Sequence, residues 1–392
     1  MNFMSIAFVL VCALCFSTPA SAIPFPLGLW VEVEGPNRTL DSLDRLEAML
    51  QAAKEMGVEH LFIQVYRGNR AWYPSKLADD GPFQAILRRD GQDPLAFVLR
   101  KAHERGMKVH AWVNLFNLAR NREALVIRRL GRDAILTDTL GRSLLDYQDL
   151  QPGDGLALDT PGYWLDPANP TVQAYLIEVM IELVSHYPHL DGLHFDYIRY
   201  PYAVPLPPDS TSPRLDFGYG ETSLKRFEQE TGLLRPKDGQ NSASDEAWKT
   251  WRQRQLTAFL GQLRAQVKQR NPHLVLSAAL LPSPARAVAA LQDWGGWLEE
   301  GLLDLGVIMN YTKDADLART LTRQALAARG KGRLFVGIGV YALLDQPDLL
   351  FEQITSAVSE GADGIVLFSH DNLLKKEGMF QTIRRMNFCR VC

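Results

Sequence analysis

The 392-residue chain is expected to fold as an α/β protein, a (β/α)8 TIM barrel with enlarged loops after strands two, three and four. Three observations lead to this expectation. Short apolar runs alternate with amphipathic stretches, eight such runs are present, and the extra chain length falls in three connections. Eight units in about 350 residues fit a closed barrel better than an open sheet. No Gly-x-Gly-x-x-Gly motif follows the first run, which disfavours a dinucleotide-binding sheet.

The expected strands are the apolar runs at residues 27–33, 60–65, 108–113, 191–196, 274–280, 305–310, 334–340 and 364–368. The expected helices are the amphipathic stretches at 43–54, 94–105, 172–187, 248–270, 315–328 and 349–359. The enlarged loops are 67–93, 115–171 and 199–245. All three follow strand ends on the carboxyl face, where barrel enzymes build their sites. They are therefore expected to enclose a substrate cleft. The alternative is that they are insertions without a role in function.

Residues 1–22 are expected to be an export signal. Residues 6–16 are all apolar or small, and Ala20-Ser21-Ala22 offers a small-x-small cleavage site, although residues 1–5 contain no Lys or Arg. The run is shorter than the roughly 20 residues that span a bilayer. We expect cleavage after Ala22, one domain over 23–392, a periplasmic or secreted protein, and no stable membrane insertion. A buried strand or an uncleaved anchor are the alternatives.

Composition narrows the function classes. Hydrophobic residues make up 46% and charged residues 22% of the chain, which is typical of a globular protein and not of a disordered one. The formal charge of −3 disfavours a dedicated nucleic-acid binder. Cys389 and Cys392 lack the context of a redox or zinc motif, so a local disulfide in the tail is expected and no metal or cofactor is.

Alternation along the strands places polar side chains inside the barrel. In the first strand Leu29 and Val31 suit the helix layer, which turns Trp30, Glu32 and Glu34 inward. In the next three strands the same alternation turns inward Gln64, Tyr66, His110, Trp112, Asn114, His194 and Asp196. Polar groups are costly inside a barrel unless they are satisfied, so their placement at strand ends indicates a functional site.

The densest polar stretch is Asp-Gly-Leu-His-Phe-Asp-Tyr-Ile-Arg-Tyr-Pro at 191–201. Asp196 ends the fourth strand, and Arg199 follows closely enough that we expect it to keep the Asp196 carboxylate ionised. Upstream, Trp-Leu-Asp-Pro-Ala-Asn-Pro at 164–170 contains Asp166 and leads into a helix.

These two segments, with Gly-Leu-Trp-Val-Glu at 28–32 and Gly-Met-Lys-Val-His-Ala-Trp at 106–112, resemble the family-10-like glycosyl hydrolases. The resemblance extends over about residues 27–375. It implies an exported enzyme that hydrolyses glycosidic bonds of a bacterial envelope polysaccharide, with peptidoglycan glycan strands as the leading substrate. Members commonly carry two adjacent acids at the end of the fourth strand. Here Tyr197 follows Asp196, so the role of the second acid does not transfer.

Glycoside hydrolysis needs two carboxyl groups flanking the scissile bond, one protonated and one ionised. Asp196 is the first choice for one of them. The candidates for its partner are Glu32, Glu34 and Asp371, and Glu32 ranks above Asp371 because alternation turns it inward. The expected fifth and seventh strands end without an acid, near Leu281 and Tyr341.

Sugar binding needs aromatic faces for stacking and polar partners for hydroxyl groups. The candidate substrate-binding residues are Trp30, Glu34, Gln64, Tyr66, Arg67, Trp112, Asn114, Asp166, His194, Arg199, Tyr200, Asn310, Tyr311 and Tyr341. For Trp30 and Trp112 the alternative interpretation is that their side chains only fill the barrel interior. Arg67, Arg70 and Arg199 suit an anionic substituent, with ordinary ion pairs as the alternative.

Two rival functions remain open. A barrel that has lost catalysis would bind carbohydrate only, and substitution of Asp196 separates this case from an enzyme. Metal-assisted hydrolysis would recruit His110, His194, His370 and Asp196, whose spacing lacks a tight ligand motif. Insensitivity to chelators would eliminate that second rival.

Overall fold

A computed structural model describes residues 23–147, 158–202, 216–236, 242–385 and 389–390. The expected signal segment at 1–22 and the expected disulfide partner Cys392 lie outside the described residues. Within the described ranges, no helix combines the length and the apolar character that crossing a membrane requires.

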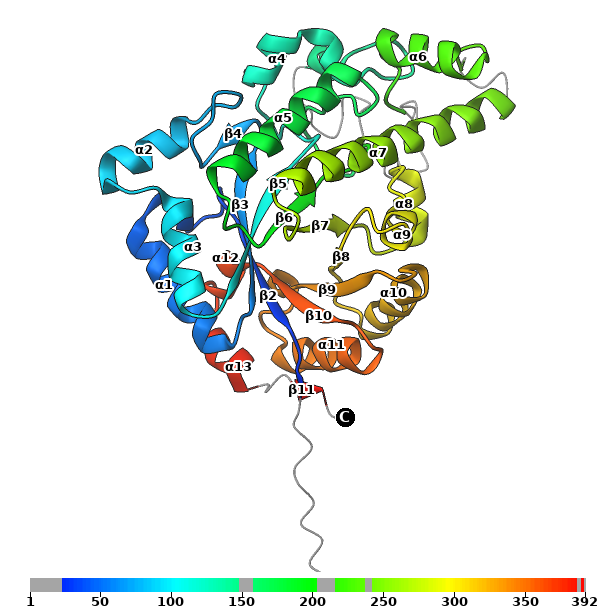
Figure 1. The fold of residues 1–392 in the computed structure, drawn as a ribbon. Helices are drawn as coiled ribbons and strands as arrows, with labels where there is room; N and C mark the ends of the chain where they lie inside the picture. Colours follow the sequence, from blue (N-terminus) through cyan, green and yellow to red (C-terminus); the bar gives the residue numbers. More distant parts are fainter. Residues whose placement is uncertain (1–22, 148–157, 203–215, 237–241, 386–388, 391–392) are drawn as a thin grey trace, which may run out of the picture.

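Eight parallel strands form a closed barrel (Figure 1). They are β2 (Leu27–Val31), β3 (His60–Arg67), β5 (Lys108–Asn114), β6 (Gly192–Asp196), β7 (Val275–Leu280), β8 (Leu305–Asn310), β9 (Arg333–Gly339) and β10 (Gly364–Phe368). Each strand pairs with the next, and β2 pairs with both β3 and β10, which closes the sheet. The predicted (β/α)8 fold is confirmed, and each expected strand matches an observed one to within a few residues.

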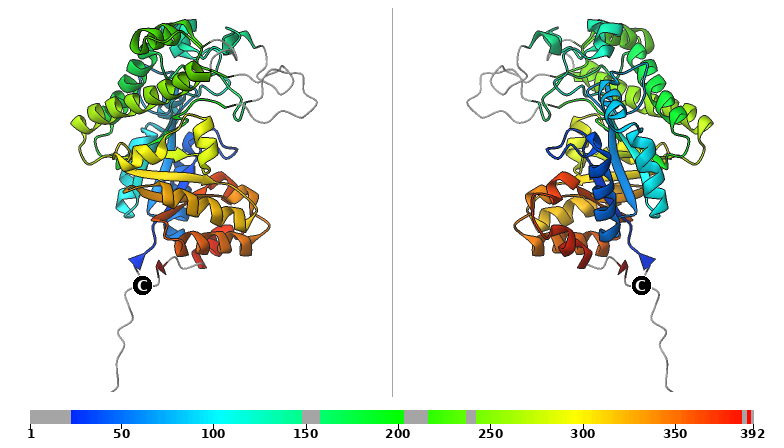
Figure 2. Two further views of the ribbon diagram at one scale, coloured as in Figure 1. Left: turned by 90° about the vertical axis from the view of Figure 1, so that its right-hand side faces the viewer. Right: turned by 90° about the vertical axis from the view of Figure 1, so that its left-hand side faces the viewer.

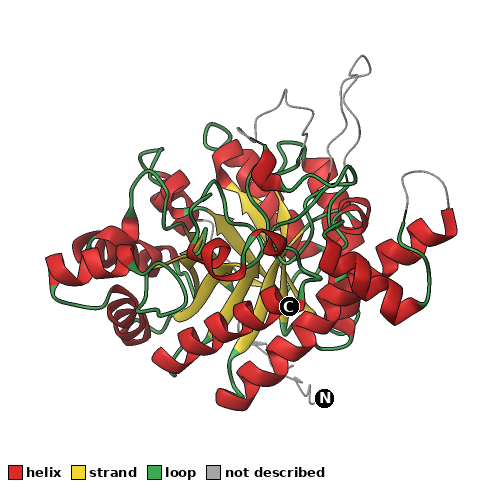
Figure 3. Cartoon of the chain, turned by 90° about the horizontal axis from the view of Figure 1, so that it is seen from above, coloured by secondary structure: helices red, strands yellow, loops and turns green. Residues whose placement is uncertain are grey.

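Helices surround the strands, as the view from above shows (Figure 3). The main ones are α1 (Leu43–Met56), α3 (Pro94–Glu104), α5 (Pro170–His186), α7 (Ser242–Arg270), α9 (Trp294–Glu299), α10 (Ala315–Ala328) and α11 (Pro347–Ser359). Two of them begin at strong caps. Asp93 accepts hydrogen bonds from the backbone of α3, and Asn169 accepts one from Thr171 in α5, with a proline at the first helical position of each.

The enlarged loops carry extra elements at the carboxyl ends of the strands. The first loop adds β4 (Arg70–Ala71) and α2 (Gly81–Asp90). The second loop adds α4 (Leu125–Leu130) and the short helices η2 (Arg132–Ala134) and η3 (Leu144–Asp146). The third loop adds α6 (Glu221–Thr231). Phe227 of α6 packs with Trp248 and Trp251 of α7 in a small hydrophobic cluster separate from the main core. This cluster joins the third loop to the helix layer.

Short elements complete the chain. They are η1 (Thr39–Asp41), α8 (Pro284–Ala289), η4 (Val340–Ala342), α12 (His370–Leu373) and α13 (Met379–Arg385). The two-residue strands β1 (Ile23–Pro24) and β11 (Cys389–Arg390) pair in antiparallel fashion, and Figure 2 shows them side by side at one end of the molecule.

Aromatic side chains fill the barrel interior. Trp30 packs with Phe62 and Phe368, and a Cβ on Gly337 would lie 2.6 Å from its indole ring, so this position accommodates only glycine beside Trp30. Trp30 Nε1 donates a hydrogen bond to His194 Nε2 (3.1 Å), which leaves His194 Nδ1 to donate to Ser277 Oγ (3.0 Å). Burial lowers the pKa of His194 to about 3, so His194 is a neutral part of the core.

A β-bulge overturns the expected orientation of Tyr66. Gln64 of β3 pairs with Trp112 of β5, but Tyr66 pairs with the next residue, Val113, so β3 carries one extra residue there. Tyr66 therefore points to the helix layer, where its hydroxyl accepts a hydrogen bond from Asn69 Nδ2 (2.9 Å). The inward orientation predicted for Tyr66 is wrong because alternation assumes an unbroken period of two.

Candidate active site

Two adjacent cavities open at the carboxyl end of the barrel. The first, of about 650 Å³, is lined by Asp159, Thr160, Asp196, Tyr197, Arg199, Leu281, Pro282, Ser283, Arg286, Met309, Tyr311, Thr312, Leu317, Leu321 and Tyr341. The second, of about 620 Å³, is lined by Glu34, Arg67, Gly68, Arg70, Asn114, Asn117, Ala119, Arg120, Asn121, Arg122, Glu123, Thr160, Pro161 and Tyr197. Thr160 and Tyr197 line both, so they form the wall between the cavities.

Asp196 lies at the border of the two cavities. It is the last residue of β6, and it pairs in register with Asn114 of β5, which lines the second cavity. The backbone N–H of Tyr197 donates to Asp196 Oδ1 (2.8 Å), and Trp112 Nε1 donates to Oδ2 (3.3 Å). Tyr197 adopts a left-handed backbone conformation, with φ of 54°. Such strain in a non-glycine residue is frequent at functional sites.

Burial raises the pKa of Asp196 to about 6, and the hydrogen bond from Tyr197 and the charge of Arg199 only partly oppose that shift. Arg199 favours the ionised form of this carboxylate, as expected, but desolvation outweighs the arginine and the net shift of the pKa is upward. A carboxyl group with a pKa of about 6 is mostly ionised at neutral pH and becomes protonated in mildly acidic solution.

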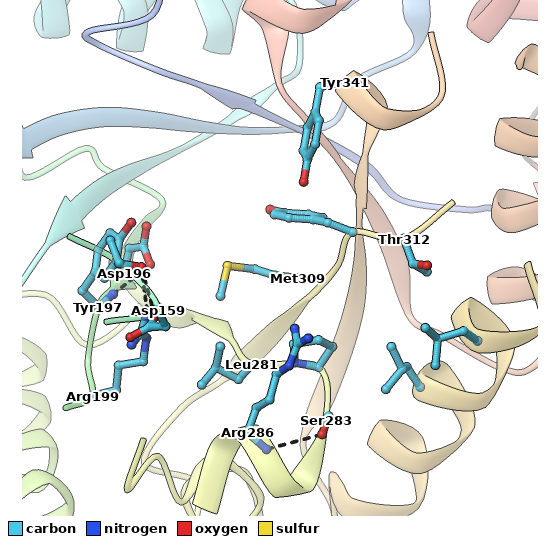
Figure 4. Close-up of a pocket in the computed structure, with 15 residues that line it drawn as sticks. Asp159, Asp196, Tyr197, Arg199, Leu281, Ser283, Arg286, Met309, Thr312 and Tyr341 are labelled. Carbon is cyan, nitrogen blue, oxygen red and sulfur yellow. Dashed lines mark hydrogen bonds and ion pairs between the residues drawn. The ribbon is translucent and has the colours of Figure 1, made fainter. Parts of the chain in front are cut away.

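Arg199 forms its ion pair with another acid, Asp159. Its Nη2 lies 2.7 Å from Asp159 Oδ2, and both side chains are almost fully buried. The guanidinium also lies over the rings of Trp164, Tyr197 and Tyr202. Figure 4 shows Asp159, Arg199, Asp196 and Tyr197 gathered at one side of the first cavity. Asp159 was not predicted from the sequence, because it lies within a long loop where no strand alternation marks it.

Glu32 and Asp196 share a neighbour, Tyr311. Burial raises the pKa of Tyr311 well above its ordinary value, and the negative charges of Asp196 and Glu32 add to that shift. Tyr311 stacks on Phe368, with ring centroids 5.2 Å apart, and lines the first cavity. Glu32 follows β2 directly, and its Oε2 accepts a hydrogen bond from Ser369 Oγ (2.5 Å). Glu32 itself lines neither cavity, so its link to Asp196 is the Tyr311 phenol on which both charges act.

The other two acids have different surroundings. Glu34 lines the second cavity and lies 3.0 Å from Arg67 Nε and 3.3 Å from Arg70 Nη1. Asp371 lines neither cavity; its Oδ1 accepts a hydrogen bond from the backbone of Asn37 (2.7 Å). Burial raises the pKa of Asp371. Its contacts hold the loop that follows β2.

The structure brings part of the predicted binding set together. Asp196, Arg199, Tyr311 and Tyr341 line the first cavity. Glu34, Arg67 and Asn114 line the second cavity. Two further members lie directly behind lining residues: Trp112 donates to Asp196, and Gln64 Nε2 donates to Asn114 Oδ1 (3.1 Å).

Other members of that set contact the protein interior instead of either cavity. Trp30 and His194 bond to each other inside the barrel, and Tyr66 faces helices. Asp166 accepts hydrogen bonds from Ser223 Oγ (2.6 Å) and from the Ala168 N–H (2.9 Å), and burial raises its pKa to about 6.

Two more predicted binding residues also lie away from the cavities. Tyr200 packs against the Arg252 guanidinium. Asn310 Nδ2 donates to Ala318 O (2.8 Å) in α10. Asn310 points outward because Leu305 and Val307 of the same strand occupy the barrel interior, and a strand alternates its faces.

Each histidine proposed as a metal ligand has a hydrogen-bonding partner of its own within the protein. His110 Nε2 and His60 Nδ1 lie 3.0 Å apart in the barrel, His194 bonds to Trp30, and His370 Nδ1 lies 3.3 Å from Thr39 Oγ1. Among the residues that the structure describes, no three His, Cys, Asp or Glu side chains are arranged to hold a metal ion.

Residues 27–329 match the family model described as glycosyl hydrolase-like 10. The chain belongs to this family. It is similar to the glycosyl hydrolase DigH of Escherichia coli strain K12, with 28% identity over 374 residues that cover 86% of this chain and 76% of DigH. The glycosyl hydrolase YngK of Bacillus subtilis is 26% identical over 161 residues, which cover 40% of this chain and 28% of YngK. This glycosyl hydrolase-like 10 member is a glycoside hydrolase.

Solved structures share the fold of this family member. The glycoside hydrolase domain of PgaB (BpsB) from Bordetella bronchiseptica superposes with a TM-score of 0.66 at 14% identity, covering 93% of this chain and 99% of that domain. The catalytic domain of a β-amylase from Paenibacillus polymyxa superposes with a TM-score of 0.60 at 15% identity. The superposition covers 93% of this chain and 98% of that domain. At such identities the likeness concerns the barrel architecture alone.

Proposed function

We propose that this enzyme acts outside the cytoplasm and cleaves a glycosidic bond of a bacterial envelope polysaccharide, with peptidoglycan glycan strands as the leading substrate. The observation that carries the proposal is the position of Asp196. Its carboxyl group, with a pKa of about 6, lies where two cavities meet. A glycan that crosses the Tyr197 wall would occupy both cavities and present one linkage to Asp196.

Asp196 acts in this mechanism as the ionised carboxylate, and Glu32 is the proton donor. Hydrolysis needs one group of each kind on either side of the bond. Glu32 is preferred over Glu34 because the Glu34 carboxylate already faces two arginines. Neither Glu32 nor Asp371 lines a cavity, and Glu32 is preferred because its charge acts on Tyr311 beside Asp196, whereas Asp371 is bound to the loop at Asn37. Tyr341, 47% exposed at the rim of the first cavity, offers a ring face on which a sugar can stack.

The proposed location rests on the apolar run at 6–16 and on Ala20-Ser21-Ala22. N-terminal sequencing of the native protein is expected to begin at Ile23 in an extracytoplasmic fraction. Recovery of an intact Met1 from the cytosol would contradict the export proposal and leave the hydrolase activity untouched.

Incubation with a panel of purified glycans, followed by mass spectrometry of the products, identifies the substrate. On that glycan, Asp196→Asn is expected to reduce turnover by about 10³-fold or more, since the loss of a reacting carboxylate costs several kcal/mol of barrier. The folded state should persist because Asn keeps the size of Asp. Near-normal turnover in Asp196→Asn would place the chemistry elsewhere.

The proton donor is identified with substrates that differ in their leaving group. An activated aryl glycoside needs little protonation of the leaving oxygen, whereas a natural sugar linkage needs it fully. Glu32→Gln is therefore expected to lose far more activity on the natural linkage than on the aryl glycoside. Glu34→Gln and Asp371→Asn serve as matched acid-to-amide controls. An equal loss on both substrates for Glu32→Gln would exclude it as the donor.

A further inference from the structure

The second cavity is positively charged. Its lining contains four arginines, Arg67, Arg70, Arg120 and Arg122, and two glutamates, Glu34 and Glu123. It lies directly beside the first cavity, with Tyr197 and Thr160 between them. A group bound there would therefore be part of the same ligand that reaches Asp196.

Two of the arginines are presented by a tight hairpin. Arg67 of β3 pairs directly opposite Arg70 of β4. The two residues between them, Gly68 and Asn69, have φ values of 59° and 60°, the signature of a two-residue turn with both central residues left-handed. Asn69 Nδ2 donates to the hydroxyl of Tyr175 (2.8 Å) and its Oδ1 accepts from the backbone of Val126, which anchors the turn.

The cavity lining carries more positive than negative side chains, although the hairpin arginines themselves have acidic partners. Like charges directly opposite each other on paired strands are unfavourable. Glu34 alone lies close to both guanidinium groups, at 3.0 Å and 3.3 Å. Asp79 approaches Arg70 only to 3.9 Å, and its side chain is about half exposed. Within the cavity itself Glu34 is the shared partner of both arginines, since Asp79 is not among the lining residues, and an anionic ligand would add to this balance.

Asn117 adds an unsatisfied donor to the same cavity. Its Oδ1 accepts a hydrogen bond from the Ala119 N–H (2.8 Å), which fixes the orientation of the amide. Its Nδ2 is buried without a hydrogen-bond partner, and the residue as a whole is 3% exposed. A buried N–H group without an acceptor is costly, and a small rotation of the Asn117 amide would be needed for a ligand in the cavity to supply that acceptor.

We propose that the second cavity is a subsite for a carboxylate carried by a sugar next to the scissile bond. This inference rests on the proposed function, because it places the acidic sugar beside the bond that Asp196 attacks. A carboxylate provides two acceptor oxygens that match the planar fork of a guanidinium. An ether-linked lactyl group and a uronic acid both supply this chemistry.

Binding is measured by calorimetry on the Asp196→Asn protein, so that the ligand is not consumed. The probes are three oligosaccharides of equal length: one with lactyl ether carboxylates, one of uronic acids, and one neutral chitooligosaccharide. At least one carboxylated probe is expected to bind about tenfold tighter than the neutral one, in keeping with charge-assisted hydrogen bonds. The probe that shows the preference identifies the source of the carboxylate.

Two added substitutions test the site. Asn117→Asp keeps the acceptor for the Ala119 N–H and replaces the unpartnered donor by a negative oxygen, and Arg70→Gln removes one guanidinium. Each is expected to remove most of the tenfold preference, with thermal melting as a check on folding. Arg323→Gln, an exposed arginine that pairs with Glu360 on the outer helices, is the matched control and should retain the preference.

Equal affinity for all three probes would overturn the proposal, as would a preference that persists in both Asn117→Asp and Arg70→Gln. These outcomes are distinct from failure of the proposed function. Turnover of a glycan without any charge preference contradicts the subsite alone. A charge preference in binding with no turnover of any glycan by the wild-type enzyme supports the subsite and contradicts the proposed hydrolysis.

Discussion

Arg199 Nη2 and Asp159 Oδ2 lie 2.7 Å apart in an ion pair whose side chains are only 5% and 7% exposed. This pair neutralises the one arginine that follows Asp196 in the densest polar segment of the chain. Burial dominates the pKa of Asp196 and holds it at about 6, although the charge of Arg199 acts to lower it. The partner of this arginine is thus an acid from a separate loop, not Asp196.

Asp159→Asn is expected to destabilise the protein by about 3 kcal/mol, because it leaves the Arg199 charge buried without its partner. Equilibrium unfolding in denaturant measures this change. The double variant Asp159→Asn/Arg199→Gln should recover part of the loss, since no unpaired charge remains. If Asp159→Asn unfolds at the same denaturant concentration as the wild type, the pair contributes nothing to stability.

Asp196→Asn is expected to stabilise the fold at alkaline pH. The folded-state pKa of Asp196 is about 6, above the ordinary value of 3.8. The folded protein therefore holds this proton more tightly than the unfolded chain, and the free energy of unfolding falls as pH rises from about 4 to about 6. The neutral Asn avoids this cost. We expect Asp196→Asn to exceed the wild type by about 1 to 3 kcal/mol at pH 8 and to equal it near pH 4.

The comparison uses denaturant unfolding of both proteins at the two pH values. An Asp196→Asn protein that is less stable than the wild type at pH 8 would show that burial does not penalise this carboxylate.

The pH dependence of kcat/KM is expected to show an acidic limb centred near pH 6. In the proposed mechanism Asp196 acts in its ionised form, and protonation through its pKa of about 6 removes that form. Asp159→Asn should move this limb to lower pH, because the freed charge of Arg199 then favours the Asp196 carboxylate. A limb that stays at the same pH in Asp159→Asn would argue that another group sets it.

The barrel histidines are expected to make the protein acid-labile. Burial lowers the pKa of His60 to about 4 and that of His194 to about 3, so the unfolded chain binds protons that the folded protein does not. The free energy of unfolding should therefore decrease as pH falls below about 6.5, through pH 4 for His60 and pH 3 for His194.

Thermal melting between pH 7 and pH 4 measures this loss. His60→Gln should flatten the decline, whereas the exposed His273→Gln should follow the wild-type curve. Identical slopes for His60→Gln and the wild type would show that His60 is not responsible.

The apolar runs and their alternation determined the barrel and the location of its mouth. The expected run at 364–368 coincides with β10, and that at 305–310 coincides with β8. Alternation correctly turned Trp30 and His194 inward, because side chains on a regular strand repeat every two residues whatever surrounds them. The polar ending of β6 predicted that Asp196 lies at the mouth of the barrel, where it lines the first cavity.

The tertiary structure alone decided the rest. The bulge in β3 turned Tyr66 outward, since pairing with β5 and not the local period sets the register there. Asp159 and Asn117 lie in long loops without periodicity, and their roles arise from contacts with Arg199 and with the cavity wall. Local patterns encode which face a strand residue takes, whereas burial and the pairing of charges depend on segments distant in the chain. The pKa of Asp196 is therefore a property of the folded barrel.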